Sequence, residues 1–374
     1  MPDAAPATVG ERLGRFAEWL ERSERSPLYV ALLRGAARDF AAGGVVASAF
    51  EGVEAPPGSV PALRLMAALH YLVLRGQAGD LARFFPSAGG GEAPAHAWPA
   101  AARLIEERLP EVRARLSRGL QTNEPGRSAA LYGGLLWASE RLAAPLRVFE
   151  IGASAGLNLL AGRFTYVVGG ERLGAPASPV CLAEPWRGAP VADARGAAER
   201  LELLALSGCD PEPIDARAPG TRELLLSYVW PDEPERLDRL EAALALARER
   251  APALERARAS EWLERVLSAP SRGVPVVWQS VVWQYLPEGE RERVGGAIER
   301  AGARQALVWL TFEPGEDGLE RFELAARTWP GGERVLLARC GDHGPPIEWL
   351  TATLPRHGKG VPQLPEEAGL RPQP

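Results

Sequence analysis

The sequence predicts an α/β protein with an all-helical N-terminal domain, followed by an open, mostly parallel sheet that carries helices on both faces. Three observations support this. The chain has 374 residues, more than one ordinary hydrophobic core, so about two domains are expected. Helical periodicity fills residues 10–120. From Leu146 to Leu354, apolar strand-like runs alternate with helical segments. We therefore expect domains at 10–120 and 121–354, and a disordered tail at 355–374.

Helical periodicity in the first domain identifies four segments: residues 11–20, 27–40, 61–75 and 98–120. Segment 61–75 is apolar almost all round, which predicts a buried helix. His70 lies in it, and no second metal ligand follows at helical spacing. A core histidine bonded to a neighbour is therefore expected there rather than a metal ligand.

A polar turn over residues 121–128 interrupts the helices. It places six side chains able to hydrogen-bond or carry charge into eight residues, directly before a helix over 129–142. Asn123 or Ser128 could cap that helix. A cap does not explain Glu124 and Arg127 together, so a functional role for this turn stands beside the structural one.

The central stretch, residues 147–158, predicts a buried strand, a tight turn and a helical run, an arrangement that presents backbone N–H groups to a ligand. The spacing Glu150-x-Gly152-x-Ser154-x-Gly156 suits a nucleotide-cofactor loop. The same letters spell the Gly-x-Ser-x-Gly nucleophile elbow of an α/β-hydrolase. A plain turn that needs small residues is the third possibility. NAD fits poorly, because the dinucleotide fingerprint requires a third glycine where Leu157 stands.

The following segments predict a hairpin with a Gly-Gly turn over residues 166–173, a strand over 179–184 and a helix over 194–207. An acidic turn over 208–215 comes next. Asp210 or Asp215 could meet ribose hydroxyls, as acids after a second strand do in nucleotide-binding folds. Turn formation beside proline explains these aspartates equally well.

Asp232 is expected to cap a helix over 234–250. Further strands are predicted at residues 274–280, 306–312 and 334–339, with a helix over 288–301. Continuous apolar runs such as 274–280 are typical of parallel strands buried on both faces. Ligands of such sheets bind at the carboxyl ends of the strands. That rule places Glu150, Gln279, Ser280 and Glu313 along one rim.

Composition excludes several classes of function. A net charge of −5 gives no basic surface for nucleic acid. No apolar stretch reaches about 18 residues and no signal-peptide core is present, so we expect a cytoplasmic protein without a membrane partner. Lys359 is the only lysine and follows no strand, which argues against a P-loop or a pyridoxal site. Cys340 and His343 form only one pair of possible metal ligands, so no metal site is expected.

Two stretches resemble class I S-adenosylmethionine (SAM) dependent methyltransferases. Glu150–Gly156 resembles their first motif, and Trp278–Pro287 resembles their fourth strand and the segment after it. More specifically, the chain resembles an uncharacterised bacterial family, a domain of unknown function with a methyltransferase-like fold. The likeness extends from Phe16 to Leu354, through residues 121–128, the central loop, 228–232, 280–286 and 343–344.

The resemblance implies a Rossmann-like, methyltransferase-like fold, with SAM as cofactor and a small molecule as substrate. The residues expected at the cofactor are Glu150, Gly152, Ala153, Ser154, Gly156, Asn158 and one of Asp210 and Asp215. Catalytic candidates are Glu124, Arg127, Gln279 and His343, and substrate-binding candidates are Asn123, Trp230, Trp283 and Tyr285. His343 is the best general base, because the ordinary pKa of histidine is near 6.5. Its alternative is a loop histidine without a role.

Two other interpretations stay open. An α/β-hydrolase would use Ser154, an acid near Glu313 or Asp317, and His343, in the correct chain order. That fold needs strands before the elbow, where this sequence predicts helices. The other alternative is a non-methylating protein on the same fold, either a displacement or cyclisation enzyme or a binding protein, because fold does not fix function.

Overall fold

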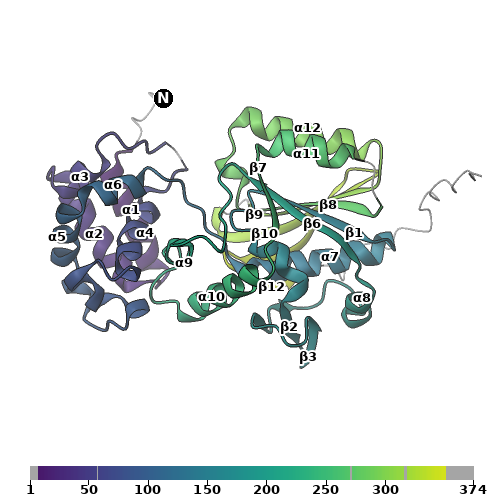
Figure 1. Cartoon of the computed structure of the whole chain (residues 1–374), viewed down its shortest axis with the longest axis horizontal. Helices are drawn as coiled ribbons and strands as arrows, with labels where there is room; N and C mark the ends of the chain where they lie inside the picture. Colours follow the sequence, from purple (N-terminus) through teal and green to yellow (C-terminus); the bar gives the residue numbers. More distant parts are fainter. Residues whose placement is uncertain (1–6, 57, 270–271, 316–317, 351–374) are drawn as a thin grey trace, which may run out of the picture.

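The computed structural model describes residues 7–56, 58–269, 272–315 and 318–350. Figure 1 shows a group of helices beside a larger part built on a twisted sheet. The tail predicted at 355–374, and Asp317, lie outside the described residues. The domain boundary expected between residues 120 and 121 stays a prediction.

The first part of the chain has helices and connecting loops but no strand among its described residues, and it surrounds a hydrophobic cluster that includes Leu13, Leu32, Leu65 and, from the second part, Trp230. Its α-helices are α1 (Val9–Arg22), α2 (Pro27–Ala41), α3 (Val45–Phe50), α4 (Pro61–Leu74), α5 (Trp98–Glu107) and α6 (Leu109–Leu116). Short 3₁₀ turns η1 (Gly79–Phe84), η2 (Pro86–Ala88) and η3 (Pro94–His96) connect α4 to α5. His70 is fully buried in α4, with Nε2 2.8 Å from the Ser87 hydroxyl, so it is a core histidine as predicted.

The single helix predicted over residues 98–120 was wrong in one respect: two helices, α5 and α6, meet at Arg108. Pro110 explains the break. Its ring removes a backbone donor and would clash with the carbonyl group four residues earlier, so α5 cannot continue through it.

The main sheet has nine strands in the order β5-β12-β11-β10-β9-β8-β1-β6-β7. Five neighbours are parallel: β7 (Ala253–Arg256), β6 (Leu203–Asp210), β1 (Leu146–Ile151), β8 (Val274–Ser280) and β9 (Leu307–Gly315). Antiparallel pairing then joins β9 to β10 (Gly318–Trp329), β11 (Arg334–Gly341) and β12 (Gly344–Trp349), and β5 (Trp186–Arg187) lies parallel to β12. The sheet is therefore mixed, and the expected mostly parallel arrangement describes only the β7-to-β9 half.

Helices cover both faces of the sheet (Figure 1). On one face lie α7 (Ser128–Leu142), α8 (Ala194–Arg200) and α10 (Pro234–Glu249), and on the other α11 (Ala259–Ser268) and α12 (Glu288–Gly302). Strand β1 shows the division: Val148 belongs to the hydrophobic cluster of the first face, and Phe149 to that of the second. All six residues of β1 are buried, as expected for a strand packed on both sides.

A small second sheet contains β2 (Thr165–Val168), β3 (Glu171–Gly174) and β4 (Cys181–Ala183). The predicted hairpin is confirmed: β2 and β3 pair antiparallel, and both Gly169 and Gly170 have positive φ. The remaining elements are η4 (Pro125–Arg127), η5 (Leu157–Arg163), α9 (Thr221–Leu226) and η6 (Trp283–Tyr285).

Two local predictions were wrong. The helix expected over 194–207 ends at Arg200, and Leu203 begins β6, which pairs with β1. A short leucine-rich run is compatible with a strand as well as with a helix. Here the segment forms a strand because its backbone hydrogen-bonds to β1. The helix α10 begins after Glu233, not Asp232, and no side chain caps it.

Two glycines in helices test this packing. A Cβ at Gly133 of α7 would lie 2.1 Å from the Trp349 ring of β12, whereas one at Gly295 of α12 would meet nothing within 4 Å. Gly133→Ala should therefore destabilise the protein by about 1–3 kcal/mol, as overpacking does. Gly295→Ala should stabilise it by about 0.5–1 kcal/mol, because alanine favours helix. Urea unfolding of both variants measures this, and equal changes would contradict the packing described.

Candidate functional site

A cavity of about 660 Å³ lies where the helical part meets the carboxyl ends of the parallel strands. The strand side contributes Ile151, Gly152 and Ser154 after β1, Cys209, Asp210 and Pro211 at the end of β6, and Ser280, Val281 and Val282 after β8. The helical side contributes Phe16 and Trp19 of α1 and Leu63 of α4. The volume is in the range of small-molecule sites.

The loop after β1 is held by hydrogen bonds from other elements. The Ala153 N–H donates to the Cys209 carbonyl (3.0 Å), the Ser154 N–H to the Asp210 carboxylate (2.9 Å) and the Leu157 N–H to Asn123 Oδ1 (2.9 Å). These donors are therefore not free to cradle a phosphate. Three residues of this turn have a positive φ angle: Gly152, Ser154 and Gly156. A positive φ is uncommon for a residue other than glycine, such as Ser154.

The two glycines of this loop serve packing. A Cβ at Gly152 would lie 2.4 Å from Val282 Cγ2, and one at Gly156 would lie 2.9 Å from Leu254 and Pro252. Gly156, Ala153 and Asn158 do not line the cavity, whereas Gly152 and Ser154 do. Packing therefore requires glycine at positions 152 and 156, whatever ligand the cavity takes.

Of the two candidate aspartates, only Asp210 lines the cavity. Its Oδ2 accepts from the Ser154 N–H, and its Oδ1 from the Glu212 N–H (2.9 Å) and the Gln121 amide (3.4 Å). Asp215 is exposed and bonds the N–H of Arg217 two residues on, which is the turn-forming alternative.

The polar turn, residues 121–128, forms hydrogen bonds to the loop after β1, and three of its residues line the cavity. Asn123 also donates to the Ala153 carbonyl (3.2 Å), so its amide bridges the loop after β1 and does not line the cavity. Glu124 is 2% exposed and does not line it either. Gln121, Thr122 and Arg127 are the cavity-lining residues of the turn, and the first two were not among the predicted site residues.

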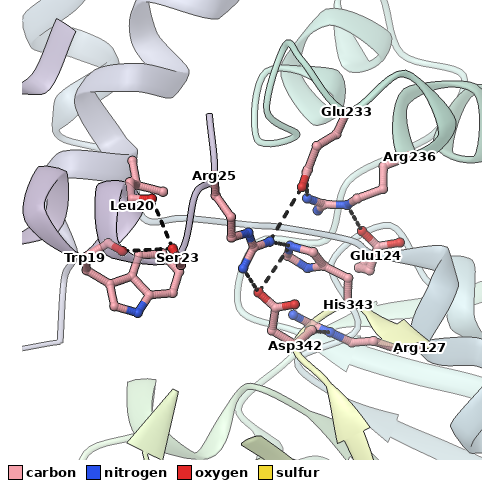
Figure 2. Close-up of polar contacts among 10 residues, drawn as sticks. All are labelled: Trp19, Leu20, Ser23, Arg25, Glu124, Arg127, Glu233, Arg236, Asp342 and His343. Atoms are coloured by element: carbon pink, nitrogen blue, oxygen red, sulfur yellow. Dashed lines mark hydrogen bonds and ion pairs between the residues drawn. The ribbon is translucent and has the colours of Figure 1, made fainter. Parts of the chain in front are cut away.

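A network of arginines and acids lies between the helical part and the sheet (Figure 2). Arg25 contacts Asp342 (2.8 Å) and Glu233 (3.5 Å). Arg236 pairs with Glu233 and with Glu124 (2.8 Å), and Arg239 lies 3.6 Å from Glu124. We call these six residues the ion-pair network. Arg25 and Asp342 join segments 317 residues apart, and neither was predicted from sequence.

His343 lies beside this network. Its Nε2 is 3.1 Å from Arg25 Nη2 and 3.4 Å from Asp342 Oδ2 (Figure 2). An arginine can only donate, so Nε2 accepts and the ring proton belongs on Nδ1. Burial and the nearby Arg236 and Arg127 strongly lower the pKa of His343. The ring is therefore neutral with its Nε2 lone pair engaged, which disfavours the predicted role of general base.

Gln279 and Glu313 hold the segment after β8. Gln279 is 1% exposed, donates to Glu313 Oε1 (2.9 Å) and accepts from the Trp309 indole (3.1 Å). The N–H groups of Val282 and Trp283 also donate to Glu313 Oε1. Of the residues predicted in this region, Ser280 and Tyr285 line the cavity, whereas Gln279 and Trp283 do not. Trp230 lines it from the helical side, with Arg25 stacked 4.3 Å from its ring.

The structure does not assemble a Ser-His-acid triad in its described residues. The Ser154 hydroxyl donates to the Gln121 carbonyl (3.3 Å), while His343 is bonded to Arg25 and Glu313 to Gln279. No strand precedes β1 in the described chain. The described residues also hold no group of three or more metal-ligating side chains.

Glu150 is a buried residue of strand β1. It is 2% exposed and does not line the cavity, and its Oε2 has no hydrogen-bond partner among the described residues. Burial raises the pKa of Glu150 to about 8, and the neighbouring Trp278 and Asn158 side chains only partly oppose this. Whether Glu150 meets a ligand stays a prediction, and the structure makes it a buried, protonatable group.

Glu124 offers a stability test. Glu124→Gln removes the charge that faces Arg236, whose side chain is 9% exposed, and leaves Glu233 as the acid paired with that guanidinium. We expect a loss of about 1.5–3 kcal/mol of unfolding free energy, the value of a hydrogen bond to a charged group. The control, Glu264→Gln, breaks an exposed pair with Arg300 and should cost at most about 1 kcal/mol. Chemical denaturation decides this, and similar losses would show that the Glu124 pairs add little.

Glu150 predicts a pH dependence. Between the ordinary pKa of 4.5 and the raised value of about 8, the folded state keeps a proton that the unfolded state has lost. The contribution of Glu150 to stability is therefore full below pH 4.5 and falls as the pH rises toward 8, by up to about 1.4 kcal/mol per pH unit. Glu150→Gln has no such proton. Urea unfolding at pH 5, 6, 7 and 8 should show wild type losing stability relative to the variant, and parallel curves would refute it.

Among the described residues, no helix combines the length and apolarity needed to cross a bilayer. Comparison with known proteins gives one match. The family model described as "Uncharacterized protein conserved in bacteria (DUF2332)" covers residues 10–349. No curated protein matches the chain, and no solved structure does. The family match spans the helical part, the polar turn, the cavity and the β11–β12 turn, so this chain belongs to that uncharacterised bacterial family.

Proposed function

We propose that this protein is a SAM-dependent, methyltransferase-like enzyme that acts on a small molecule, on a Rossmann-like scaffold. The observation that supports it most is the position of the cavity. The chain passes from β1 to β6 and β7 on one side, then returns to β8 and β9 on the other. In open α/β sheets, ligands bind at the carboxyl ends of the strands at this point of reversal.

The residues of the cavity fit a nucleoside-containing cofactor. Asp210 ends the strand beside β1, and its two oxygens keep acceptor capacity beyond the three bonds described, because a carboxylate offers about four lone-pair sites. Ribose hydroxyls are suitable donors. Val282 fills the space beside Gly152, which leaves little room there for a cofactor. We therefore expect Ser154 and Asp210, which also line the cavity, to hold the cofactor.

SAM would supply the activated methyl group. The chain would then contribute positioning and exclusion of water, since holding two reactants in line lowers the barrier without an acid or base. Phe16, Trp19 and Leu63 of the helical part cover the cavity from the side opposite the strands. A neutral His343 with its Nε2 engaged is consistent with chemistry that does not depend on it as a base.

Asp210 and Asp215 provide a matched pair for testing this proposal. We expect wild type to bind SAM and S-adenosylhomocysteine, but not NAD, in calorimetric titration. Asp210→Asn should weaken SAM binding about 10–150-fold, the effect of losing one hydrogen bond to a charged group. Asp215→Asn should leave the affinity unchanged, because Asp215 is exposed and outside the cavity.

The same titration separates the alternatives. Undetectable SAM binding to folded wild type would overturn the cofactor assignment. SAM binding without methylated product from any acceptor offered would favour a non-methylating protein on this fold. Covalent labelling by a fluorophosphonate that disappears in Ser154→Ala would favour the hydrolase.

A further inference from the structure

Arg127 is a buried cation without a counter-ion. Three acids of the ion-pair network, Glu124, Glu233 and Asp342, are each within 4.0 Å of Arg25, Arg236 or Arg239. No acid lies within that distance of the Arg127 guanidinium in the described chain, and Arg127 is only 7% exposed. The group of four arginines and three acids therefore has one positive charge in excess, on Arg127.

The guanidinium of Arg127 lines the cavity. Its Nε donates to the Asp342 carbonyl (3.2 Å), and it lies 5.7 Å from the centre of the Phe312 ring. Within the part of the chain that the structure describes, neither terminal nitrogen has a hydrogen-bond acceptor. Two donors in a planar fork are thus available to a ligand.

Glu313 is the other acid of this region, and it does not neutralise Arg127. Its Oε1 accepts from Gln279, Val282 and Trp283, and its Oε2 is buried without a partner. An uncompensated buried charge is costly, so proteins pair such groups or place them where a ligand supplies the opposite charge. Here the position in the cavity favours a ligand.

We propose that Arg127 binds the carboxylate of an organic acid with an apolar body, and that this acid is the substrate. The planar fork of a guanidinium matches a carboxylate in a bidentate pair. One excess positive charge matches a monoanion better than a phosphate ester, which carries about −1.5 to −2 at pH 7. The apolar body would pack on residues that line the same cavity: Phe16, Trp19, Leu63, Leu120, Tyr228 and Trp230. The inference deepens the proposed function, since it names the substrate class of that cavity.

The test uses matched probes: 3-phenylpropanoate and octanoate, their two amides, and phenyl phosphate. In calorimetric titration of wild type at pH 7, at least one acid should bind more tightly than its own amide and than phenyl phosphate. Arg127→Gln should weaken that acid about 10–150-fold. Arg127→Lys keeps the positive charge but loses the planar pair of donors, so its affinity for the acid should lie between those of wild type and Arg127→Gln. The control, Arg141→Gln, removes an exposed charge on α7 and should change nothing.

Each outcome decides one question. If neither acid binds better than its amide, or if Arg127→Gln binds it as wild type does, the inference is overturned. Tighter binding of phenyl phosphate than of both acids would overturn the monoanion assignment. Should Arg127→Gln fail to fold, the lysine variant carries the comparison. A SAM titration of the same protein keeps the proposals apart: acid binding without SAM binding overturns only the proposed function, and SAM binding without acid preference overturns only this inference.

Discussion

The site depends on the ion pairs of Arg25, which join its helical and sheet sides. Arg25 follows α1, Glu233 precedes α10, and Asp342 lies in the turn between β11 and β12. Through Glu233 and Arg236 the network reaches Glu124 in the polar turn. Ion pairs often contribute little net stability: solvent weakens partly exposed pairs such as those of Arg25, and desolvation offsets the attraction in buried ones such as Arg236 with Glu124. We interpret their role as fixing position: they hold the segment after α1 beside the turn between β11 and β12, and α1 supplies Phe16 and Trp19 to the cavity.

Within this frame the cavity combines two environments. Near the strands it has a charged edge, with Asp210 at β6 and Arg127 beside the β11–β12 turn. Toward the helices it is apolar and aromatic, with Trp19 and Trp230 in edge-to-face contact. A ligand that fills it must therefore carry both polar groups and apolar surface. This mixture is typical of small-molecule sites, in which a few polar groups fix orientation and apolar walls provide most of the contact.

Sequence predicted the elements whose signals are local. Strand β8 and helix α12 follow from a continuous apolar run and from a charged helical pattern, and the β2–β3 hairpin follows from its Gly-Gly turn. Strand β6 was taken for helix because only its pairing with β1 identifies it. Strands β10 to β12 make the sheet mixed through short turns that a search for strand–helix alternation does not detect.

Sequence likewise indicated some of the residues that line the cavity and missed others. Ser154, Asp210 and Arg127 line the cavity as expected, since each lies in a recognisable turn or at a strand end. Glu124 and Gln279 do not line the cavity, because they bond to buried partners far along the chain, and their catalytic roles stay predictions. Arg25 and Asp342 gave no signal, because their importance comes from a contact between residues 317 positions apart.

That separation has a consequence for biosynthesis. Domains generally fold as units, starting with the N-terminal one, as the chain leaves the ribosome. If the predicted domain boundary holds, the helices α1 to α6 can bury most of their hydrophobic cluster early, whereas Trp230 joins this cluster later. The face of α1 that later covers the cavity, with Phe16 and Trp19, has no strand edge to meet until much later in synthesis. The ion pair between Arg25 and Asp342 forms only after β11 has been made, so contacts of very long range complete the cavity last.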